Sequence, residues 1–143
     1  MKALTGAKIV MHEADDRFFS SPEAQDIGRQ LGFEPSPPAD ETLKDGDILT
    51  INSVSLKVIH TPGHTPGGIC LLGEGNLFTG DTLFVGGIGR TDLPGASHQQ
   101  FMTSIKEKIL TLPDETIVWP GHDYGPHPTS TIGIEKKTNP WLF

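Results

Sequence analysis

The sequence predicts an α/β fold built from short strands and a few helices. Two runs rich in apolar residues, 47–51 and 54–59, flank the two-residue turn Asn52-Ser53, which predicts a β-hairpin. The second run alternates apolar and polar residues like a half-buried strand. A longer segment, 97–112, repeats apolar residues at helical spacing on one face. The 143 residues include 17 glycines and 12 prolines, which indicates many turns between short elements.

The first third of the chain predicts one strand and one helix. The run AKIVMH at 7–12 has the apolar character of a buried strand. Ser21 is a typical N-cap residue and Pro22 suits the first helical position, so a helix is expected to run from there to Leu31. Three prolines in 33–41 then indicate a surface loop rather than a domain boundary.

The remaining elements follow at short intervals. Strands are expected at 69–72 and 77–79 around the turn GEGN, and again at 116–119. A last short helix is expected at 131–138, before the dipeptide Asn-Pro. The length suits one domain, so residues 1–143 are interpreted as a single one.

The composition excludes some classes of partner. The formal net charge of −7 lacks the basic character of a nucleic-acid-binding surface, so no nucleic acid is expected. No run of residues is long and apolar enough for a membrane helix, so no membrane partner is expected either. The single cysteine, Cys70, cannot form an internal disulfide; it favours a reducing, cytoplasmic location and is interpreted as a small buried apolar residue.

Three predicted strands lead into loops that each carry a side chain able to bind a metal. These side chains are His64 in HTPGHTPGG, Asp81 in GDTLF and His122 in PGHDYGP. Layered α/β folds build their sites at the carboxyl ends of strands. One histidine in a loop of prolines and glycines is more often structural or exposed, so the prediction depends on the coincidence of three.

Imidazole nitrogen and carboxylate oxygen are standard zinc ligands, and they also suit iron or manganese. Since a carboxylate has two oxygens, Asp81 could bridge two metal ions. We therefore expect one or two ions, with zinc as the first choice. Bound water on zinc becomes hydroxide near neutral pH and would attack a small-molecule substrate.

The ordered motifs TPGHTPGG, GDTLF, GRTDLPG and PGHDYGP, with a closing E-x-x-x-N-P, resemble the metallo-β-lactamase superfamily, and within it the glyoxalase II-like branch. The resemblance implies an αββα sandwich. It also implies that His64 serves one metal, His122 serves the other, and Asp81 bridges them.

The same resemblance assigns roles around the pocket. Arg90 and Asp92 of GRTD would shape its floor, and Tyr124 would lie near the substrate. The implied activity is metal-dependent hydrolysis of a small thioester or ester.

The family's first metal motif, H-x-H-x-D-H, does not occur among the 143 residues. The chain is therefore expected to be an N-terminally incomplete domain, corresponding to the carboxyl-terminal two-thirds of the sandwich. Its metal site would be incomplete and its activity impaired, and an exposed sheet edge would favour self-association.

Two alternative functions stay open at this point. HDY at 122–124 and GRTD at 89–92 also resemble persulfide dioxygenases, which use a single iron. The missing motif, in turn, is compatible with a non-catalytic fragment or interaction module.

Overall fold

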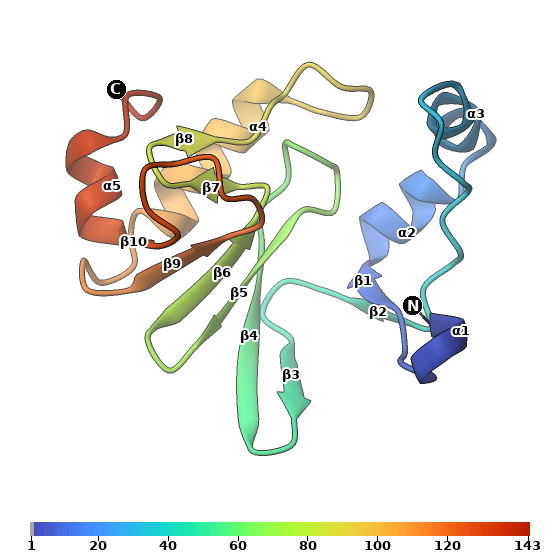
Figure 1. Ribbon diagram of the computed structural model, residues 1–143, viewed down its shortest axis with the longest axis horizontal. Helices are drawn as coiled ribbons and strands as arrows, with labels where there is room; N and C mark the ends of the chain where they lie inside the picture. The colour runs from blue at the N-terminus through green and yellow to red at the C-terminus, as the bar shows by residue number, and fades with distance from the viewer. Residues whose placement is uncertain (1) are drawn as a thin grey trace.

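A six-stranded sheet forms the centre of the computed structural model, which describes residues 2–143 (Figure 1). Its strands, in spatial order, are β10 (Ser130–Thr131), β9 (Ile117–Pro120), β6 (Asn76–Gly80), β5 (Ile69–Gly73), β4 (Val54–His60) and β3 (Ile48–Ile51). Neighbouring strands are antiparallel except β6 and β9, which run parallel. Because β6 and β9 are parallel, their carboxyl ends lie side by side, and the loops that carry Asp81 and His122 start there.

Both predicted hairpins are confirmed. β3 and β4 join through Asn52 and Ser53, and Asn52 has a φ of +54°. β5 and β6 join through Glu74 and Gly75, whose φ values of +49° and +74° are both positive. Two-residue turns of this kind match the right-handed twist of the strands that they connect.

The long connection from β6 to β9 supplies four of the ten buried residues of the core cluster. It contains the small hairpin β7 (Leu83–Phe84) and β8 (Gly87–Ile88), then α4 (His98–Ser104) and the π-helical turn η1 (Ile105–Ile109). The fully buried side chains of Phe101, Ile105 and Ile109 pack in one cluster with strand residues that include Leu77 and Val118.

The predicted helix at 97–112 therefore exists, but its second half is not α-helical. The N–H of Leu110 donates to the carbonyl of Ile105, five residues back, at 2.9 Å. The wider turn keeps Ile105 and Ile109 together on the buried face.

The last helix, α5 (Ile132–Thr138), anchors the β7–β8 hairpin. Glu135 is 1% exposed, and its Oε2 accepts from the N–H of Gly86 at 3.0 Å and from the amide of Asn139 at 2.9 Å. Asn139 also donates to the carbonyl of Gly87 at 3.0 Å. The closing E-x-x-x-N-P motif thus holds the hairpin that lines the site described below.

Residues 2–43 form a separate layer beside the sheet (Figure 1). This N-terminal layer contains α1 (Lys2–Thr5), β1 (Val10–His12), α2 (Glu13–Phe19), α3 (Pro22–Gln30) and β2 (Glu41–Leu43), with β1 and β2 parallel. The strand and helix predicted here are confirmed, whereas α1, α2 and β2 were not foreseen.

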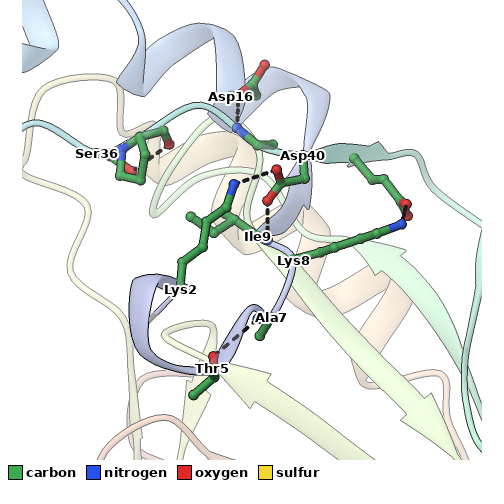
Figure 2. A network of polar contacts seen from close by, with 11 residues as sticks. Lys2, Thr5, Ala7, Lys8, Ile9, Asp16, Ser36 and Asp40 are labelled. Atoms are coloured by element: carbon green, nitrogen blue, oxygen red, sulfur yellow. Dashed lines mark hydrogen bonds and ion pairs between the residues drawn. The ribbon is translucent and has the colours of Figure 1, made fainter.

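Polar contacts hold this layer together, as Figure 2 shows. Asp40 pairs with Lys2 and accepts from the N–H of Ile9 at 2.8 Å. Asp16 of α2 accepts from the N–H of Ala39 at 2.8 Å. The loop that precedes β2 is therefore fixed to α1, β1 and α2 although it lacks regular structure.

One face of the sheet packs on α4, η1 and α5, and aromatic side chains on the other face stay exposed. Phe78 and Trp119 lie in register on β6 and β9, stack at 6.4 Å, and are 45% and 43% exposed. Across residues 2–143, no helix is long and apolar enough to cross a membrane.

Candidate metal centre

The structure brings together the three side chains that the strand-end motifs single out. Asp81 Oδ2 lies 3.5 Å from His64 Nε2, and Asp81 Oδ1 lies 3.2 Å from His122 Nε2. The carboxylate therefore sits between two imidazoles and presents one oxygen to each.

Sheet register explains why Asp81 and His122 meet. Gly80 at the end of β6 is paired with Pro120 at the end of the parallel strand β9. The N–H of Gly121 donates to the carbonyl of Gly80 at 2.9 Å, which continues the pairing past the strands. Asp81 follows Gly80, and His122 follows Gly121. Both therefore leave the sheet side by side, at the carboxyl ends of β6 and β9.

A tight loop after β4 positions His64 beside Asp81. The N–H of Gly63 donates to the carbonyl of Thr65 at 2.9 Å, and Gly63 has a φ of +140°. A Cβ at Gly63 would lie 2.3 Å from the Cα of Phe101, so only glycine lets the loop rest on α4.

The proton on the His64 ring is fixed by its neighbour. His64 Nδ1 lies 2.7 Å from the carbonyl oxygen of Arg90, which can only accept, so Nδ1 carries a proton and donates. In a neutral ring, the lone pair of Nε2 then faces the Asp81 carboxylate with no proton between them. A cation at that position, either a metal ion or a second proton on the ring, would remove this repulsion.

The donor chemistry fits a metal, but the number of donors does not complete a ligand shell. Across residues 2–143, no group of three or more His, Cys, Asp or Glu side chains is arranged to hold one ion. His64 with Asp81, and Asp81 with His122, would each supply two protein ligands, whereas catalytic zinc sites usually have three. The described residues therefore fit part of a metal centre.

A hollow of about 490 Å³ lies over these side chains. It is lined by the three of them and by residues of the β7–β8 hairpin, and also by Arg90, Leu93, Tyr124 and Trp141. Ligand sites of this size are common in enzymes. Two of the three residues predicted to bind substrate, Arg90 and Tyr124, therefore face the same space as the candidate ligands.

Asp92 supports Arg90 and does not line the hollow. The guanidinium makes two hydrogen bonds to the Asp92 carboxylate, Nε to Oδ1 at 2.7 Å and Nη2 to Oδ2 at 2.8 Å. These bonds lower the pKa of Asp92 to about 2, so the pair stays charged at neutral pH.

Aromatic contacts orient His122. Its ring stacks on Tyr124 with centroids 4.9 Å apart and planes 12° apart. Phe84 meets both rings edge to face, at 6.0 Å from His122 and 5.3 Å from Tyr124. Tyr124 itself is 72% exposed, so its hydroxyl-bearing ring is accessible at the mouth of the hollow.

Buried hydroxyls support the floor beneath the site. Thr61 Oγ1 lies 3.0 Å from Thr82 Oγ1, which connects the end of β4 to the turn after β6. Cys70 is fully buried beside them, and burial raises the pKa of its thiol to about 11. A neutral buried thiol is no nucleophile, which agrees with its interpretation as a small apolar residue.

Asp15, on α2, is a site residue that the sequence analysis missed. Its Oδ2 accepts from the hydroxyl of Thr65 at 2.8 Å, and its Oδ1 accepts from the N–H of Gly67 at 2.7 Å. The N-terminal layer thus holds the loop of His64. Since Asp15 is 50 residues from Thr65 in the chain, no local pattern could have revealed the contact.

Comparisons with known proteins identify the family of the chain. A family model described as the metallo-beta-lactamase superfamily matches residues 1–122. Hydroxyacylglutathione hydrolase GloC of Haemophilus influenzae is 43% identical over 101 residues, covering 69% of this chain and 46% of the relative.

Two solved structures are similar to 99% of this chain. BLEG-1 B3 metallo-beta-lactamase has a TM-score of 0.84 and 37% identity, over 68% of its own chain. TTHA1623, solved in a di-iron-bound form, has a TM-score of 0.79 and 33% identity, also over 68% of its chain.

The comparison covers only part of each relative. The chain spans 66%, 58% and 65% of the length of three curated relatives that match 90% or more of it. The predicted sandwich fold is confirmed for the portion that these proteins share. Because the family model covers most of the chain and the solved structures follow nearly all of it, this chain belongs to the metallo-beta-lactamase superfamily.

Proposed function

We propose that the chain is a metal-dependent hydrolase of the glyoxalase II-like type, acting on a small thioester or ester. The observation that carries the proposal is the Asp81 carboxylate between His64 and His122, with one oxygen 3.5 Å from His64 Nε2 and the other 3.2 Å from His122 Nε2. The name of the Haemophilus influenzae relative, a hydroxyacylglutathione hydrolase, supports a thioester as the substrate.

The net reaction adds water to the acyl carbon. The water oxygen forms a bond to that carbon and the carbon–sulfur bond breaks. Of the two water protons, one goes to the leaving thiolate and the other is released to solvent, which leaves a carboxylate and a thiol. A bound zinc ion would supply hydroxide near neutral pH.

The chain's own residues orient the substrate for this reaction. Arg90 lines the hollow, and its two bonds to Asp92 use Nε and Nη2, which leaves Nη1 to donate to a substrate group. A guanidinium N–H suits a thiol component bearing a carboxylate, as a peptide thiol does. Tyr124 offers a flat exposed ring at the rim.

Metal affinity is expected to be weak for this chain by itself, because the described residues offer two protein ligands to each ion. Zinc is proposed first, as one or two ions, with iron or manganese as alternatives. The di-iron form of TTHA1623 keeps iron among the candidates.

The test combines metal binding with turnover. The chain is titrated with Zn²⁺, Fe²⁺ and Mn²⁺ by calorimetry, and each loaded form is assayed on a hydroxyacyl-glutathione thioester by thiol release. Asp81→Asn should reduce metal affinity at least tenfold, whereas Asp123→Asn, on the exposed neighbour of His122, should leave it unchanged. Equal affinities in the two variants, or no thiol release with any metal, would contradict the proposal.

The same experiment distinguishes the alternatives. Oxygen uptake with a persulfide of glutathione, found only in an iron-loaded form, would favour the dioxygenase type. Absence of metal binding together with stable self-association would favour an interaction module.

A further inference from the structure

A second hollow lies beside the candidate metal centre. It encloses about 330 Å³ between the helices α2 and α3, the loop that follows α3, and the turn at Leu93 and Pro94. His64 and Leu93 line this hollow and also line the one over the metal centre. The two spaces therefore share a wall at one of the candidate ligands.

Hydrocarbon dominates the walls of this second hollow. Its largest lining side chains are apolar, namely Phe18, Phe19, Ile27, Leu31, Phe33 and Leu93. Of the lining residues only Glu34 is a carboxylate, and none is lysine or arginine. An uncharged, water-avoiding group therefore complements this space better than a charged one does.

Four of these six apolar side chains are exposed to solvent. Phe33 is 67% exposed, Leu31 is 61% exposed, and Phe19 and Leu93 are each 36% exposed. A contiguous apolar surface that adjoins a polar site is typical of a ligand-binding surface.

The volume of the hollow indicates the size of the group that it can hold, and one glycine in its wall offers a position at which to alter it. A cavity of about 150 Å³ accepts a benzene ring, so 330 Å³ accepts a group about twice that size. Gly28 of α3 lines the hollow, and nothing lies within 4 Å of the position where its Cβ would be. A Cβ at that position of the wall would therefore have open space around it.

We propose that this hollow is an acyl subsite, which receives an aromatic or medium-length aliphatic acyl group while the thioester carbonyl lies at the His64–Asp81–His122 cluster. The thiol component would then occupy the more polar hollow near Arg90. The identification of the bound group as an acyl group rests on the proposed function. The preference for an apolar group rests on the lining of the hollow itself. The substrate class becomes thioesters with an apolar acyl group.

The test measures binding without requiring catalysis. Amide analogues of N-acetylcysteamine thioesters, from acetyl to octanoyl, are titrated into the chain by calorimetry. Affinity should rise about fourfold for each added methylene until the hollow is filled. The acetyl analogue defines the baseline.

One variant fills the hollow and a matched variant does not. Gly28→Leu should weaken the octanoyl analogue at least tenfold and leave the acetyl analogue unchanged. Leucine favours a helix more than glycine does, so α3 should persist, which circular dichroism checks. Gln30→Leu adds the same side chain to α3 at an exposed residue outside the hollow, and should bind like the parent chain.

The outcomes separate this inference from the proposed function. Affinity that does not depend on chain length, or that Gly28→Leu and Gln30→Leu affect equally, overturns the acyl subsite even if thioesters are hydrolysed. A chain-length dependence abolished by Gly28→Leu supports the apolar subsite even if no metal-loaded form hydrolyses a thioester, in which case the proposed reaction fails alone.

Discussion

Asp15 connects the N-terminal layer to the loop that carries His64. Both carboxylate oxygens are used, one by the hydroxyl of Thr65 and one by the N–H of Gly67. Hydrogen bonds to an ionised acceptor are stronger than neutral ones, and their loss would leave the Gly67 donor without its partner. The position of His64 therefore depends on a side chain from another layer of the fold.

The first prediction concerns Asp15. Asp15→Ala should lower the free energy of unfolding by about 2–3 kcal/mol, measured by urea denaturation. Asp26→Ala removes a carboxylate from an exposed pair with Arg29 and should cost under about 1 kcal/mol. Similar losses in the two variants would show that Asp15 acts as an ordinary surface charge.

A second prediction concerns the glycine before His64. In Gly63→Ala the new methyl would lie 2.3 Å from the Cα of Phe101, on a backbone with φ of +140°, so the loop must move away from α4. The expected cost is about 4 kcal/mol or more in urea denaturation. Gly75→Ala also has a positive φ, +74°, but open space around the Cβ, and should cost only about 1 kcal/mol.

At the scale of elements, a pair of stacked histidines joins β1 to β4. The rings of His12 and His60 lie 3.8 Å apart with planes 10° apart, and His12 is 6% exposed. His12 Nδ1 accepts from the N–H of Ala14 and so caps α2. Protonation at Nδ1 would abolish this cap and add a charge beside His60.

Burial and the neighbouring His60 lower the pKa of His12 below its ordinary value of 6.5, although Glu13, Asp15 and Asp45 act in the opposite direction. The unfolded chain therefore binds a proton at His12 at a higher pH than the folded chain does. This contribution to stability is complete above pH 6.5 and is lost as the pH falls through the lowered pKa.

The third prediction is that stability falls as the pH is lowered and His12 becomes protonated. The urea midpoint should decrease between pH 7.5 and pH 5.5, and His12→Asn should make the decrease smaller. Asparagine keeps an N-cap acceptor but does not titrate. His127→Asn, at an exposed residue far from the junction in sequence, should keep the parent's pH dependence. Identical pH profiles for His12→Asn and the parent would contradict this role of the pair.

The sequence predicted those elements whose pattern is local. Both hairpins, the strand at 117–120, α3 and α5 were expected because alternation, caps and turn residues lie within each segment. β2 was not expected, since three residues show no period and its partner β1 is about 30 residues away. α2 was missed because its N-cap is a histidine, which is not a usual capping residue.

The same division applies to the candidate site. His64, Asp81 and His122 were found because each follows a recognisable strand, and the parallel pairing of β6 with β9 then brings two of them together. The support from Asp15, and the carbonyl of Arg90 that fixes the His64 ring, depend on contacts between distant segments. The acyl subsite was likewise invisible, because α2, which forms one of its walls, was not predicted.

At the scale of the whole molecule, the sheet is only partly covered. Helices pack on one face, while Phe78 and Trp119 stay exposed on the other. β3 forms one edge of the six-stranded sheet and carries Ile48 and Ile51, which are 59% and 60% exposed. An edge strand with exposed apolar residues offers free backbone groups and apolar surface to a second chain.

The last prediction is therefore self-association through the β3 edge. Sedimentation velocity should show a sedimentation coefficient that rises with protein concentration. Ile48→Lys should shift this equilibrium toward monomer, because a charged lysine on an edge strand disfavours pairing with another strand. Leu4→Lys places the same charge at a residue that is 89% exposed on α1, in the N-terminal layer, and should associate like the parent. Monomeric behaviour of the parent at all concentrations, or an equal shift in both variants, would contradict association through β3.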